Sequence, residues 1–226
     1  MFISDKLTNE KNQCFEHWAS INFNKLESLA NAVSKRFKEH ADDKIKGHYI
    51  RQFHNALGYR AYGSLDEGGV CKGCLYRTES FINIAQESRT GKKKYSANFT
   101  KVHIEHTIPV AVLTKMIDSF DVSRLQATSL MTFLLENSVV TAMLDSEGRT
   151  STSKLQSNGL VLCGYSKKSG VFTQNHPHFD LPFMRYTGSS NHPKIYNVLT
   201  SEEIDITTFT MEKFKSDMRI VLNKIK

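Results

Sequence analysis

The chain has 226 residues, of which 39% are hydrophobic and 23% are charged, so it can build a sizeable core without disulfides. Lys and Arg total 30 against 23 Asp and Glu, and the net charge of +7 favours an anionic partner such as nucleic acid. No run of about 18 apolar residues is present and the N-terminal segment has no apolar signal core, so we expect a cytoplasmic protein without a membrane-spanning helix.

The first third of the chain is predicted to be helical. Apolar residues recur at steps of three and four within residues 22–41 and form one stripe, made of Phe23, Leu26, Leu29, Ala30, Val33 and Phe37. Asn24 and Glu27 have the spacing of a capping pair. A second helix is predicted over residues 42–58, where Gly58 is a natural stop and the apolar face carries Ile45, Tyr49, Phe53 and Leu57.

Residues 58–75 contain five glycines and no periodic pattern, which indicates a loop or a small knuckle. Cys71 and Cys74 could present two thiolates to one zinc ion, but a closed structural site needs four ligands. Cys14 and Cys163 are distant in the sequence, although the fold could bring either of them close. A metal-free loop with free thiols is therefore favoured over a structural zinc site at Cys71 and Cys74.

Beyond residue 90, short elements alternate. The basic triplet Lys92, Lys93 and Lys94 forms a solvated loop or contacts the phosphate backbone of DNA. A strand is expected up to residue 106, then a helix after Pro109 and a further helix capped by Ser123. Residues 137–144 and 158–165 are predicted strands, and the C-terminal segment is an amphipathic helix capped by Thr210.

The segment KVHIEHTIPVAVL, residues 101–113, places an acid beside a histidine where a strand gives way to a helix. On a regular strand His103 and Glu105 share one face, but at a frayed strand end Glu105 and His106 can reach the same cleft. A neutral imidazole can activate water near pH 7, and a carboxylate suits a hard cation. The plain alternative is that His106 is a packed residue with satisfied hydrogen bonds.

The sequence EHTIP, residues 105–109, resembles the first element of the HNH, or ββα-metal, endonucleases, and is similar to a variant of restriction-type members. The resemblance covers about residues 100–165. It implies an α+β fold in which a helical N-terminal region carries an embedded ββα-metal nuclease element. It also implies that Glu105 binds Mg²⁺ or Mn²⁺ and that His106 is the general base in the hydrolysis of DNA.

The family pattern also has a middle asparagine and a later metal ligand, and two stretches compete for these roles. Asn137 is followed by Asp145 eight residues later, whereas Asn158 begins the better strand match but is followed by Lys167, which cannot bind a metal while protonated. His176 is a further candidate ligand. We favour Asn137 as a catalytic residue and Asp145 as a metal ligand, and Arg185 as a possible phosphate clamp on DNA.

The organisation that we expect is a helical region over residues 1–60, an HNH-like nuclease region over 61–200, and a C-terminal helix in 201–226 that packs on the same unit. Such an enzyme would form a homodimer if its site is palindromic. The alternatives are a non-catalytic nucleic-acid-binding protein and a protein-interaction factor in which His106 is buried.

Overall fold

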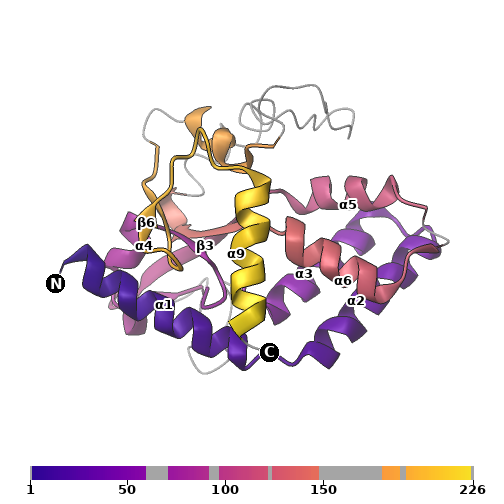
Figure 1. The fold of residues 1–226 in the computed structure, drawn as a ribbon, viewed down its shortest axis with the longest axis horizontal. Helices are drawn as coiled ribbons and strands as arrows, with labels where there is room; N and C mark the ends of the chain where they lie inside the picture. Colours follow the sequence, from indigo (N-terminus) through magenta and orange to yellow (C-terminus); the bar gives the residue numbers. More distant parts are fainter. Residues whose placement is uncertain are drawn as a thin grey trace.

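The computed structural model describes residues 2–59, 71–91, 97–121, 124–147, 180–188 and 192–224. It has the predicted α+β architecture, in which a group of helices lies beside a mixed six-stranded sheet (Figure 1). Helix α9 (Met211–Lys224) stands between the sheet and the helical group, and α1 (Ile3–Ala19) runs along the lower edge of the sheet side (Figure 1).

The helical N-terminal region consists of α1, α2 (Phe23–Lys38) and α3 (Asp43–Ala56). The predicted stripe of α2 is confirmed in part, because Leu26, Ala30, Val33 and Phe37 are buried. The predicted capping pair is wrong: the N-cap is Asn22, whose side chain accepts a hydrogen bond from the backbone nitrogen of Lys25.

The predicted apolar face of α3 is confirmed in part, because Phe53 and Leu57 are buried while Ile45 is not. Ile45 is 43% exposed, whereas Ile50, Phe53, His54 and Leu57 are buried. The side chain of Asp42 accepts hydrogen bonds from Lys44 and Ile45 and so fixes the start of the helix. The buried face of α3 thus also includes a histidine, His54, which the predicted stripe left out.

The sheet has the order β2-β3-β4-β1-β5-β6. Its strands are β1 (Tyr76–Thr78), β2 (Arg89–Thr90), β3 (Thr100–His106), β4 (Val140–Leu144), β5 (Ile195–Asn197) and β6 (Glu202–Glu203). Strand β1 lies parallel to β4 and antiparallel to β5. Short α4 (Glu79–Asn83) and the 3₁₀ segments η1 (Gln86–Ser88) and η4 (Pro182–Gly188) join these strands.

Two helices, α5 (Val110–Asp118) and α6 (Ala127–Asn137), connect β3 to β4. Pro109 is the N-cap of α5, as its fixed φ favours. The N-cap of α6 is Gln126 and not Ser123, which lies outside the described residues. The predicted cap of the C-terminal helix is confirmed, since Thr210 Oγ1 accepts a hydrogen bond from the Lys213 backbone nitrogen.

One connected hydrophobic cluster draws on all three expected regions, with Trp18, Ile104 and Phe214 among its members. The Trp18 indole donates a hydrogen bond to the carbonyl of Gly73, and Asp217 of α9 accepts from Tyr76 at 2.7 Å. The regions therefore share a core across their boundaries. In the described ranges, no helix has the length and apolar character needed to cross a bilayer.

Candidate active site

The pairing of β3 with β4 determines the surroundings of the acid–histidine segment. The strands are antiparallel, with Glu105 opposite Thr141 and His106 opposite Val140. The strand predicted over residues 137–144 therefore forms over 140–144 and pairs with β3, while Asn137 belongs to α6. The turn at Asn137 and Ser138 thus lies at the same end of the sheet as His106.

Glu105 is buried and its two carboxylate oxygens have different neighbours. Its Oε1 lies 2.8 Å from Nη2 of Arg185, and its Oε2 lies 3.4 Å from Nε2 of His103. Burial raises the pKa of Glu105, but the hydrogen bond from His103 and the charge of Arg185 outweigh it, so the pKa is lowered overall. Glu105 is therefore an ionised carboxylate with a counter-charge already in place.

Arg185 has a different role from the DNA clamp that the sequence suggested. Its side chain is 1% exposed, so it has no surface to offer to a DNA backbone. In addition to Glu105, its Nη1 binds the carbonyls of His106 and Thr107 at 2.7 and 3.1 Å. Arg185 thus ties η4 to the end of β3 and fixes the backbone that carries the candidate base.

His106 is half-buried and its ring is held by a second histidine. Its Nε2 lies 3.1 Å from Nδ1 of His54, and Nε2 of His54 lies 2.7 Å from Oγ of Ser138. The His54 and His106 rings are inclined by 30°, with centroids 5.1 Å apart. His54 was not among the residues expected at the site, because the face predicted for its helix placed it beside the core and not in it.

Both imidazoles are neutral in this environment. Burial lowers the pKa of His106 to about 4, although the charge of Glu105 opposes this shift. Burial also lowers the pKa of His54 well below its usual range, and the nearby His106 and Arg51 act in the same direction. His106 therefore has one ring nitrogen with a lone pair at neutral pH, as a general base requires.

The other two expected site residues do not converge on Glu105. Asn137 ends α6, and its side-chain amide donates a hydrogen bond to the carbonyl of Phe133. Asp145 pairs with Lys101 at 3.2 Å, beyond the end of β4 that pairs with the start of β3. It lies four positions along the chain from Thr141, the partner of Glu105, which corresponds to about 13 Å of extended chain.

The described residues do not fit a divalent cation. Among them, no group of three or more His, Cys, Asp and Glu side chains could hold a metal ion, and Glu105 is already paired with Arg185. Asn158, Lys167 and His176, as well as the basic triplet Lys92, Lys93 and Lys94, lie outside the described residues. We therefore assign no chemical step to a metal.

Cys71 and Cys74 are packed into the core. Cys71, Cys74 and Cys14 of α1 are free thiols with no exposed surface. Burial raises the pKa of Cys14 to about 12 and that of Cys74 well above its usual range. Among the described residues, no group of three or more metal-ligating side chains is found around them, and Cys163 lies outside these residues.

We expect these three thiols to be unreactive in the native protein. Burial raises the pKa of Cys14 and Cys74 and so suppresses their reactive thiolate form, and Cys71 has no exposed surface for a reagent to reach. Alkylation followed by peptide mass spectrometry should label all four cysteines in guanidinium and spare Cys14, Cys71 and Cys74 without it. A chelator should leave the melting temperature unchanged. Rapid native labelling of Cys74, or a lower melting temperature after chelation, would contradict this assignment.

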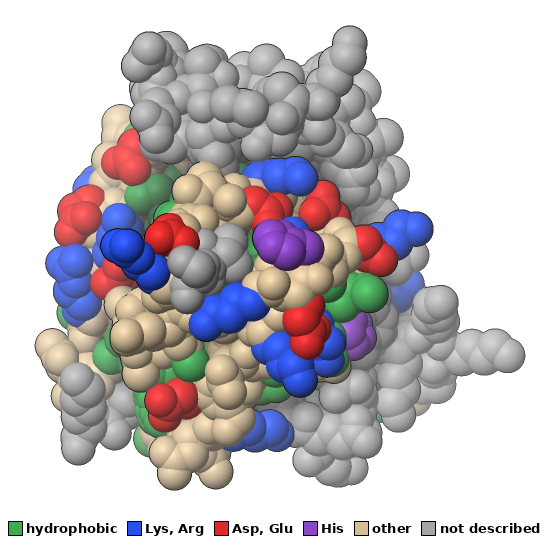
Figure 2. All heavy atoms as spheres, turned by 90° about the vertical axis from the view of Figure 1, so that its right-hand side faces the viewer, with side chains coloured by type: hydrophobic (Ala, Val, Ile, Leu, Met, Phe, Trp, Pro, Cys, Tyr) green, Lys and Arg blue, Asp and Glu red, His purple; other side chains and the backbone are tan. Residues whose placement is uncertain are grey.

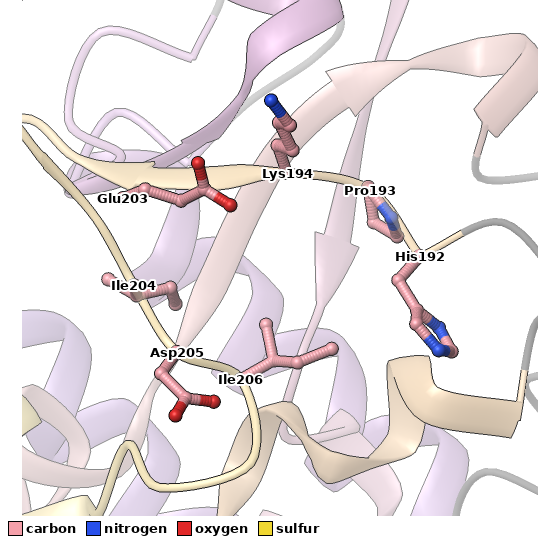
Figure 3. A pocket seen from close by; sticks show the side chains of 7 residues that line it. All are labelled: His192, Pro193, Lys194, Glu203, Ile204, Asp205 and Ile206. Carbon is pink, nitrogen blue, oxygen red and sulfur yellow. The ribbon is translucent and has the colours of Figure 1, made fainter.

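The visible surface does not display one sign of charge. Figure 2 shows acidic and basic side chains interspersed on the face formed by the helical group. A hollow beside β6 carries His192 and Lys194 on one segment and Glu203 and Asp205 on the facing one (Figure 3). Neither Glu105 nor His106 lines this hollow, and its mixed charge gives a phosphate no preferred position.

Comparisons of the chain with protein-family models, with curated proteins and with solved structures find no match.

Proposed function

We propose that the protein is an HNH-type endonuclease that hydrolyses DNA phosphodiester bonds with His106 as general base. The observation that carries the proposal is the position of His106. A neutral, half-buried imidazole lies where β3 ends, beside an ionised carboxylate, and its ring is held by a hydrogen bond. A positioned neutral histidine is the most frequent general base in hydrolytic enzymes.

In this proposal His106 takes a proton from the attacking water. Arg185 keeps the strand end in place through Glu105 and the carbonyl of His106. The net charge of +7 supports attraction to a polyanion. Mg²⁺ or Mn²⁺ and a homodimer remain part of the proposal through the resemblance of residues 105–109, with no ligand set assigned.

A second candidate is a nucleic-acid-binding protein without catalysis. The observation that favours it is the pairing of Glu105 with Arg185, which occupies the carboxylate that the resemblance assigns to a metal.

The test is a plasmid-cutting assay with Mg²⁺ and with Mn²⁺. We expect the wild-type protein to cut and His106→Ala to lose about 10²–10⁴-fold in rate, which is the usual contribution of a general base. His48→Ala is the matched control, because His48 is an exposed histidine of α3 whose ring is hydrogen-bonded to Gln52 and packs against Tyr49.

Cutting that survives His106→Ala would exclude this mechanism. DNA binding without any cutting, measured by gel shift at low salt, would favour the second candidate. The absence of both at low salt would leave the protein-interaction factor as the remaining alternative from the sequence.

A further inference from the structure

The hydrogen-bonded series His106–His54–Ser138 joins three separate elements. His106 ends β3, His54 lies in the last turn of α3, and Ser138 follows α6. The two contacts are 3.1 Å between the rings and 2.7 Å to the serine hydroxyl. His54 is 1% exposed and Ser138 is 1% exposed, so water has little access to the middle of the series.

The burial of His54 makes its hydrogen bonds obligatory. Leaving a buried polar atom without a partner destabilises a protein, and each ring nitrogen of His54 has one hydrogen-bond partner among the described residues. The carbonyl of His54 also accepts hydrogen bonds from Leu57 and Tyr59, which anchor the end of α3. The ring therefore has a fixed position from which to orient His106.

Two neutral rings joined by one hydrogen bond allow two directions of donation. In the forward direction, His106 Nε2–H donates to His54 Nδ1, and His54 Nε2–H donates to Ser138 Oγ. In the reverse direction, the serine donates to His54 Nε2 and His54 Nδ1–H donates to His106 Nε2. The forward direction places the proton on Nε2 of both rings, which is the more stable tautomer of a neutral histidine side chain. The reverse direction requires the less stable tautomer twice.

We propose that His54 is a positioning residue that accepts the Nε2–H of His106 and so leaves Nδ1 of His106 as the nitrogen that takes the proton. The catalytic part of this inference rests on the proposed nuclease function. When His106 takes a proton from water on Nδ1, it keeps its Nε2–H bond to His54 and becomes an imidazolium. His54 stays neutral throughout, and its lone pair stabilises the new charge.

The direction of donation can be measured without any activity assay. In the ¹⁵N-labelled protein, we expect a nitrogen–nitrogen coupling across the hydrogen bond, with the proton attached to Nε2 of His106 and His54 Nδ1 as the acceptor. His106→Gln and His54→Leu spectra assign the two rings. A proton attached to Nδ1 of His54, or the absence of any coupling between the rings, would overturn the proposal.

Kinetics supply the second readout. We expect His54→Leu to lower kcat by about 100-fold with KM changed less than about twofold, because the base loses its orientation and substrate contacts remain. His54→Asn should recover most of the rate, since its amide oxygen can accept from His106 in place of Nδ1. His48→Leu, on the exposed face of the same helix, is the control. Thermal unfolding of each variant shows which are folded.

The outcomes separate the two proposals. If the wild-type protein cuts DNA and His54→Leu remains folded with an unchanged kcat, the positioning role is wrong and the nuclease proposal stands. If the wild-type protein does not cut at all, the nuclease proposal fails, and the coupling measurement still decides whether His54 accepts the proton of His106.

Discussion

Glu10→Gln should lower the free energy of unfolding by about 3–5 kcal/mol, the usual cost of removing one partner of a buried ion pair. Glu10 of α1 is 4% exposed and faces two buried arginines, Arg77 and Arg89. Both guanidinium groups bind its carboxylate, and neither reaches water. The substitution would leave two buried positive charges without the carboxylate that binds both of them, because their remaining hydrogen-bond partners are carbonyls. Glu87 acts favourably on Arg89 only through its charge and forms no ion pair with either arginine among the described residues.

The cost of burying these charges is reflected in the pKa values of the two arginines. Burial, followed by the charge of Arg89, lowers the pKa of Arg77 to about 9, and burial lowers that of Arg89 to about 10. Denaturant unfolding of the variant, compared with Glu16→Gln on the exposed face of the same helix, measures the effect. The control should change stability by less than about 0.5 kcal/mol. An equally small change for Glu10→Gln would show that the buried charges are compensated in another way.

Arg185→Met should also cost about 3–5 kcal/mol, since it leaves the carboxylate of Glu105 buried without its cation and two backbone carbonyls without their donor. Cutting should fall with it, because the backbone on each side of the candidate base loses its attachment to η4. Adding Glu105→Gln to Arg185→Met removes the uncompensated charge, so the pair should show a coupling energy of about 1–3 kcal/mol in a double-mutant cycle.

The same pair predicts a dependence of stability on pH. Although burial acts against it, His103 and Arg185 lower the pKa of Glu105 below its unfolded value. The pair therefore stabilises the fold above the unfolded pKa of about 4.3, and this stabilisation is lost as the pH falls through the lower folded value. Urea unfolding between about pH 6 and pH 3 should show a smaller loss for Arg185→Met than for wild type.

Arg124→Met is the control for this series, because Arg124 is an exposed arginine paired with Asp121. Its unfolding curves should follow those of the wild type at each pH. Equal pH dependence in wild type and Arg185→Met would contradict the role assigned to the buried pair.

The sequence predicted long, periodic elements better than short or buried ones. The apolar stripe of α2 was predicted from its spacing and is buried in part, and the strand expected in the β-rich residues 137–144 forms over 140–144. Strand β1 has three residues, all of them buried, so it shows neither alternation nor a helical period. Strand β6 has only two residues, which is too short for any pattern.

The candidate site divides in the same way. The adjacency of Glu105 and His106 is local information, so their position at the end of a strand could be predicted directly from the sequence. Predicting His54 as a site residue required the correct buried face of α3. The signal available in the sequence was the position of this histidine among Ile50, Phe53 and Leu57, which are spaced as core residues of a helix. The pairing of Arg185 with Glu105 depends on tertiary contacts between distant segments, which the sequence does not reveal. Arg185 was therefore predicted to lie at the surface and bind phosphate, whereas it is buried.

The order of the strands has a consequence for how the chain can acquire its structure during synthesis. Strand β1 cannot complete its pairing before β5 is synthesised, because Thr78 pairs with Ile195. The hydroxyl of Tyr76 in β1 also donates a hydrogen bond to Asp217, which is 141 positions later in the chain. Such distant pairings are slow to form, because a long loop must close before any contact is gained. Until residues 195–224 have left the ribosome, one edge of β1 stays open to pairing with other chains. We therefore expect ribosome-bound chains that stop before β5 to depend on chaperones, and release of the C-terminal segment to complete the sheet.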